Sequence, residues 1–136
     1  MYMKTMLNRS YANTILKPMS NFLYLFRGGD EAYQKLSQEE RQNHMEVWGQ
    51  WMEKLQGKGH LLDGQPLAEE GMVVQNRGEV ITNGPHAEGA ELVGGYLIIS
   101  AKDLAEATEI SKSCPIFDYD GSTVEVRPIL SMEEHI

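Results

Sequence analysis

Residues 22–30 of this 136-residue chain read Phe-Leu-Tyr-Leu-Phe-Arg-Gly-Gly-Asp. A short apolar, aromatic run that stops at two glycines is typical of a β-strand followed by a turn. Alternation along the strand sends its apolar side chains to opposite faces, with Phe22, Tyr24 and Phe26 on one face and Leu23 and Leu25 on the other. This strand therefore needs apolar cover on both sides of its sheet.

Another predicted strand, at residues 96–99, also has apolar side chains on both faces. Helices can cover one face, and nothing else in the chain is long enough to cover the other. Burying four such side chains is worth about 1.5–3 kcal/mol each, so the pattern predicts a homodimer that packs sheet against sheet. The alternative is that residues 1–20 fold back over the second face.

The first helix is predicted to begin at a capping box formed by Ser37 and Glu40, after a connector over residues 31–36. The apolar residues that follow at helical spacing predict its buried stripe, namely Met45, Trp48, Met52 and Leu55, widened by Val47 and Trp51. A second helix opens at residues 100–103 and ends at Pro115. Its predicted inner side holds Leu104, Ala107, Ile110 or Ser111, and Cys114.

The remaining strands are predicted at residues 60–67 and 123–128, with a hairpin of residues 72–75 and 79–82 around a Gly-containing turn. The order β-α-β, hairpin, β-α-β is that of an α+β, ferredoxin-like split βαβ sheet with an extra hairpin. The expected divisions are an N-terminal extension, tail or arm (1–20), the domain (21–130) and a C-terminal tail (131–136), with Met19 as an alternative start.

Composition narrows the expected partners. The chain has 12 basic and 20 acidic residues and a net charge of −8, so neither a nucleic acid nor an anionic membrane surface is expected to bind it. One cysteine and the absence of any apolar run near 18 residues predict a cytoplasmic protein without a disulfide framework.

The last predicted strand alternates differently. Val124 and Val126 share one face, and Glu125 and Arg127 share the other. If the valines face the helices, both charged groups enter the space between two sheets, which is the candidate pocket. The two groups either bind a polar or anionic small molecule or form a structural ion pair across the dimer.

Three residues are candidates for acid–base chemistry, and each has a simpler interpretation. His44 is either a general base or a helix-surface residue, and His86 is either a ligand contact or an exposed turn residue. Asp63 either pairs with Arg27 or Arg127 or makes a turn. No metal and no cofactor are expected, because the ligand types do not cluster and no phosphate loop or dinucleotide motif is present.

Several ordered segments together resemble the YCII-related family, in the branch with an Asp-Gly-Pro-Phe signature: residues 26–30, 55–64, 80–85, 94–96 and 124–128. The resemblance implies a dimeric α+β barrel, and some relatives are joined to sigma-factor-like domains. Here the signature reads Asn83-Gly84-Pro85-His86, with an amide and an imidazole in place of the carboxylate and the phenyl ring. The family's helix histidine falls near Trp48, with His44 one turn earlier.

The expected ligand-binding residues are Arg27, Trp48, Asn83, His86, Glu125 and Arg127. Two functions remain open. The first is a homodimeric small-molecule-binding or regulatory domain with its pocket between the two sheets. The second is a cofactor-independent enzyme of lyase, isomerase or oxygenase type that acts on a small organic molecule in the same pocket.

Overall fold

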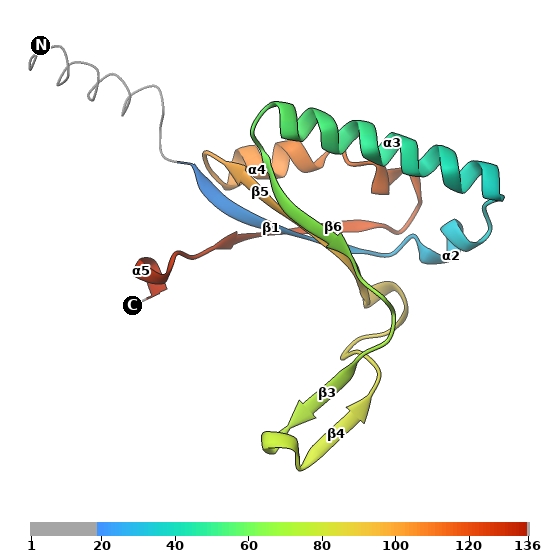
Figure 1. Ribbon diagram of the computed structural model, residues 1–136, viewed down its shortest axis with the longest axis vertical. Helices are drawn as coiled ribbons and strands as arrows, with labels where there is room; N and C mark the ends of the chain where they lie inside the picture. Colours follow the sequence, from blue (N-terminus) through green and yellow to red (C-terminus); the bar gives the residue numbers. More distant parts are fainter. Residues whose placement is uncertain (1–18, 136) are drawn as a thin grey trace, which may run out of the picture.

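The computed structural model describes residues 19–135, without the side chains of Ala90 and His135 (Figure 1). Its centre is a four-stranded sheet made of β1 (Ser20–Arg27), β2 (Leu61–Pro66), β5 (Val93–Ala101) and β6 (Thr123–Ile129). Helices α3 (Gln38–Gly57) and α4 (Leu104–Ser111) lie together on one side of this sheet. The remaining elements are the hairpin β3 (Met72–Gln75) and β4 (Val80–Asn83), the short helices α2 (Asp30–Gln34) and α5 (Met132–His135), and three 3₁₀ turns: Asn76–Gly78, Gly89–Glu91 and Pro115–Asp118.

The sheet is antiparallel, with the strand order β2-β5-β1-β6. This is the split βαβ arrangement, so the predicted α+β fold with an extra hairpin is confirmed. At one corner of the sheet Asn21 of β1 pairs with Ile129 of β6, which brings the first and last strands together where the chain enters and leaves the sheet. The predicted tail or arm lies almost wholly in residues 1–18, outside the described residues.

Helix α3 begins as predicted. The Ser37 hydroxyl accepts a hydrogen bond from the backbone N–H of Glu40, and the Glu40 carboxylate accepts one from the N–H of Ser37, each at 3.1 Å. The predicted buried stripe is partly wrong, because Met45 and Val47 are exposed. The inner side of α3 instead contains His44, Trp48, Trp51, Met52 and Leu55.

Asp103 caps the start of helix α4, because its carboxylate accepts a hydrogen bond from the backbone N–H of Glu106 at 2.8 Å. Ala107 and Ser111 are buried as predicted, and so is Cys114 beyond the helix end, but Leu104 is exposed. The predicted connector at 31–36 is also wrong in part, because residues 30–34 form the short helix α2.

The core lies between the helices and the sheet. Tyr24 and Ile99 are its largest fully buried side chains. The Tyr24 hydroxyl donates a hydrogen bond to the backbone carbonyl of Ala107, which ties β1 to α4. Among the described residues, no helix is long and apolar enough to cross a membrane.

Candidate functional site

The side of the sheet away from α3 and α4, here called the open face, has an apolar centre. Val124 and Val126 pack against the core, so the side chains that alternate with them point to the open face. The strand register then places Glu125 beside Leu25, and Arg127 beside Leu23. The members of the open face used below are Leu23, Leu25, Arg27, Tyr96, Ile98, Glu125 and Arg127.

The apolar centre of the open face is only half-buried. Its four members, Leu23, Leu25, Tyr96 and Ile98, are intermediate in exposure, whereas the aromatic residues on the other face of β1 are buried. The two-faced apolar pattern predicted for β1 and β5 is therefore present. No described segment covers the open face with a second layer like that formed by α3 and α4.

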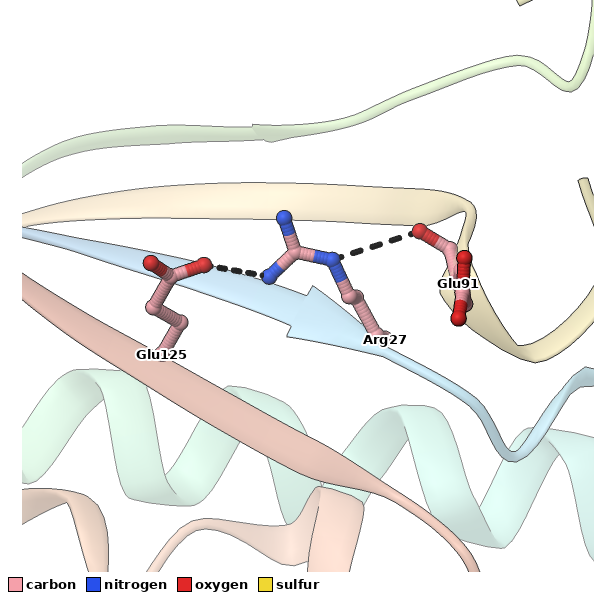
Figure 2. A network of polar contacts seen from close by, with 3 residues as sticks. All are labelled: Arg27, Glu91 and Glu125. Atoms are coloured by element: carbon pink, nitrogen blue, oxygen red, sulfur yellow. Dashed lines mark hydrogen bonds and ion pairs between the residues drawn. The ribbon is translucent and has the colours of Figure 1, made fainter. Parts of the chain in front are cut away.

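Arg27 makes two polar contacts at the open face, one with Glu125 and one with the backbone of Glu91 (Figure 2). Its Nη1 donates to Oε1 of Glu125 at 2.6 Å, and its Nε donates to the backbone carbonyl of Glu91 at 3.2 Å. The third guanidinium nitrogen points away from both partners. The partner of Glu125 is thus Arg27 of the same chain. Arg127 takes part in none of the ion pairs of the described residues.

Glycines shape the turn that follows Arg27. Gly28 and Gly29 have φ values of 83° and 81°, a conformation that costs other residues about 1–2 kcal/mol. A Cβ atom at Gly28 would overlap the carbonyl oxygen of Gly121, so the turn packs closely on the loop before β6. The glycine stop seen in the sequence therefore fixes the end of β1 next to that loop.

A cleft of about 480 Å³ brings Arg27 together with His86. Its walls come from the segments that lead into and out of the hairpin, and its lining residues are Arg27, Leu67, Ala68, Glu70, Pro85, His86, Ala87, Glu91, Leu92 and Val93. A larger, neighbouring cleft of about 860 Å³ shares Pro85 and Leu92 with it. The larger cleft carries several carboxylates, namely Asp30, Glu31, Glu69, Glu88 and Asp120.

His44 and Trp48 lie on the helix side of the sheet, away from this cleft. The Trp48 indole N–H donates to Nε2 of His44 at 2.8 Å, and the Trp48 ring packs on Phe26 with centroids 5.4 Å apart. The Tyr119 ring packs on the His44 imidazole at 4.8 Å. Burial lowers the pKa of His44, and the Asp118 carboxylate opposes this effect. Of the predicted ligand residues, Trp48 therefore does not share the open face.

Two further candidates are separated from the arginines. Asp63 is exposed on the edge strand β2, and its Oδ1 accepts a hydrogen bond from the backbone N–H of Gly64 at 2.8 Å. The ion pairs of the described residues do not include Asp63. Asn83 is exposed at the base of the hairpin, where it pairs with Met72.

No metal or thiol centre accompanies these residues in the described part of the chain. No group of three His, Cys, Asp or Glu side chains is placed there to hold a metal ion. Cys114 is buried, and burial raises the pKa of its thiol to about 12. The thiolate needed for nucleophilic chemistry is therefore scarce near neutral pH.

Sequence reasoning missed two features of the site. The first is Glu91, because a backbone carbonyl acceptor leaves no pattern in side-chain types. The second is the wall formed by Leu67, Ala68 and Glu70. The broken apolar pattern after Pro66 is the signal that this segment leaves the sheet and lines a cleft.

Comparison with known proteins identifies the family. The family model of the YCII-related domain matches residues 23–133, which include all four strands of the sheet from β1 residue Leu23 onward. A search of the curated proteins finds no match. Since the matched region spans most of the chain and contains the whole candidate site, the chain belongs to the YCII-related family.

Proposed function

We propose that this protein is a homodimeric binding or regulatory domain that holds a polar or anionic small molecule between two open faces, at Arg27. The observation that carries the proposal is the state of the Arg27 guanidinium. Glu125 and the Glu91 carbonyl hold it in place, and one nitrogen is left directed away from both. A donor fixed in this way loses little further entropy when it binds an anion.

The charges on the open face favour an anionic ligand. Arg27 of β1 lies next to Glu125 of the adjacent strand β6, and Arg127 lies two residues further along β6. This part of the face therefore carries a net positive charge in a chain whose overall charge is −8. On the same face, Leu25 of β1 lies beside Tyr96 of the next strand, β5. An arginine beside an apolar floor suits a small organic carboxylate whose carbon body packs on that floor.

A second copy of the chain would complete this site. The half-buried leucines, Tyr96 and Ile98 offer an apolar surface that water covers poorly. Packing of one open face on another would exclude water from Arg27 and strengthen its charge-assisted hydrogen bonds, because the local dielectric constant falls. The same packing is the sheet-against-sheet homodimer expected from the sequence.

A cofactor-independent enzyme of lyase, isomerase or oxygenase type is the second candidate. One observation favours it: His86 lines the same cleft as Arg27. In such an enzyme the arginine would orient the substrate's carboxylate, and the imidazole of His86 would accept or return a proton. His44 is a poorer candidate for that role, because its Nε2 already accepts the Trp48 N–H on the opposite side of the sheet.

A thermal-shift screen of small carboxylic acids tests the proposal. A ligand at 100 times its dissociation constant stabilises the protein by about 2.7 kcal/mol, which is a shift of several degrees. We expect Arg27→Ala to abolish this shift. Lys112→Ala, which removes a positive charge at the end of α4, should leave it unchanged. An undiminished shift in Arg27→Ala would remove Arg27 from the site.

His86→Gln separates the two candidate functions. In a binding domain this variant keeps most of the thermal shift, and no ligand is consumed by either protein. In an enzyme the wild type converts the ligand over time and His86→Gln does so at least about 100-fold more slowly, as expected for loss of a general base. Mass spectrometry of the ligand after incubation distinguishes the two results.

A further inference from the structure

The hairpin of β3 and β4 presents an apolar face to its surroundings. The strand register puts Met72, Val74 and Ile81 on one face, with Val74 directly opposite Ile81. These three side chains are 69%, 60% and 58% exposed. A hairpin that only connected β2 to β5 would not be expected to expose such an apolar cluster to water.

The hairpin receives little support from the rest of the described structure. Its strands make their extensive contacts only with each other and with the turn between them. The N–H of Gly84 donates to the carbonyl of Gly71 at 2.6 Å and closes the base of the hairpin. Two-stranded hairpins that pack on nothing are marginally stable in water. The apolar face is therefore expected to have a partner.

Charge and position indicate which partner this is. The eight residues of β3 and β4 include no charged side chain, although the chain contains 20 acidic and 12 basic residues. Solvent-exposed strands usually carry charges that prevent association. The hairpin also projects away from the sheet on the side opposite α3 and α4, which is the side of the open face (Figure 1).

We propose that the hairpin is an arm that packs through Met72, Val74 and Ile81 on a second copy of this chain, at the end of its open face that carries Leu23 and Ile98, while the end that carries Arg27 faces the partner's sheet. Both apolar surfaces lie on the same side of one chain, so a two-fold axis brings each arm to the partner's open face and satisfies both surfaces at once. This inference rests on the homodimer in the proposed function, and it adds the segment that holds the dimer together.

The arm also affects the ligand site. The segments at its base contribute Ala68, Glu70, Pro85 and His86 to the cleft that contains Arg27. An arm seated on the partner fixes the direction of these segments, and hence the position of the cleft wall. The second copy therefore holds the wall of this cleft in one position.

Two substitutions of the same type on opposite faces of the hairpin test this proposal. Val74 lies on the apolar face, whereas Val80 pairs with Gln75 on the other face. Sedimentation should give twice the chain mass of 15.4 kDa for the wild type. Val74→Glu should raise the dimer dissociation constant at least about tenfold, since it buries a charge, and Val80→Glu should change it less than about threefold.

The outcomes separate the arm from the dimer. A wild type that sediments at the mass of one chain at high concentration overturns the arm and the proposed homodimer together. A dimer in which Val74→Glu and Val80→Glu behave alike overturns the arm alone. Circular dichroism checks that both variants remain folded.

Cross-linking gives a measurement that does not depend on a destabilising variant. A photoreactive phenylalanine in place of Ile81 is introduced into a mixture of ¹⁴N- and ¹⁵N-labelled chains. Cross-links between differently labelled chains, to peptides that contain Leu23 or Ile98, support the proposal. Cross-links confined to one chain, including any to residues 1–18, overturn it.

Discussion

The indole N–H of Trp48 donates a hydrogen bond to Nε2 of His44, one helical turn earlier, at 2.8 Å. This bond requires an imidazole whose Nε2 carries no proton. The surroundings of His44 consist mainly of rings, with Tyr33 on α2 and Tyr119 before β6 at centroid distances of 5.8 Å and 4.8 Å. The hydrogen bond between these two α3 side chains therefore forms only while His44 is neutral, and it holds the imidazole against the Tyr119 ring of the loop before β6.

Stability is expected to fall in mild acid because of His44. Burial lowers its pKa in the folded state, against the smaller opposing effect of Asp118. The stabilisation is complete above the ordinary histidine pKa of about 6.5 and is lost as the pH falls through the lower folded value. Chemical denaturation between pH 8 and pH 5 measures this loss.

The variant for this prediction is His44→Gln. A glutamine at position 44 does not titrate, so the curve of unfolding free energy against pH should flatten below the ordinary histidine pKa of about 6.5. If the slope of His44→Gln equals that of the wild type, another group causes the acid sensitivity.

Gly28→Ala is expected to destabilise the protein by more than about 2 kcal/mol, because it combines an unfavourable positive φ with overlap on the Gly121 carbonyl. Gly121→Ala is the control, since Gly121 has φ 81° and no atom within 4 Å of its Cβ position. Urea denaturation of both variants measures the difference. Equal losses would mean that the close approach at Gly28 is unimportant.

Tyr24→Phe is expected to cost about 1–2 kcal/mol, because it leaves the ring in place and removes the hydrogen bond to the Ala107 carbonyl. Burial also raises the pKa of Tyr24. Its hydroxyl therefore favours folding below the ordinary tyrosine pKa of about 10, and this contribution is lost as the pH rises further. Denaturation at pH 8 and at pH 11 should show a smaller decline in Tyr24→Phe than in the wild type; an equal decline would assign the effect to other groups.

Ser37→Ala is expected to destabilise the protein by about 1 kcal/mol, since it removes the acceptor for the Glu40 N–H at the start of α3. Ser37→Asp keeps an acceptor there, so its unfolding free energy should fall by only a few tenths of a kcal/mol. Thermal unfolding followed by circular dichroism compares the two. A loss of the same size in both variants would show that the cap contributes nothing to stability.

The fold was predictable where local chemistry is distinctive. Three signals act within a few residues and match the structure: the continuous apolar run of β1, the Gly28–Gly29 stop and the Ser37–Glu40 box. The errors concern residues whose burial depends on distant partners. Met45 and Leu104 have the right spacing for the core, but no described segment buries them, whereas His44 is held inward by aromatic rings from α2 and the loop before β6.

The candidate site was only partly predictable for the same reason. Alternation along β6 correctly separates Glu125 and Arg127 from the two valines. The pairing of Glu125 with Arg27 depends on the register of β1 against β6, which no single segment reveals. The placement of Trp48 on the far side of the sheet likewise follows from the rotation of α3 about its axis.

The pairing of Asn21 with Ile129 means that the domain begins and ends at one corner of the sheet. Joining the two ends with a short linker and opening the chain at an exposed loop should therefore give a circular permutant that still folds. A protein fused to either end would also emerge from the same point, so the order in which two such domains are joined would have little influence on how closely they can approach each other.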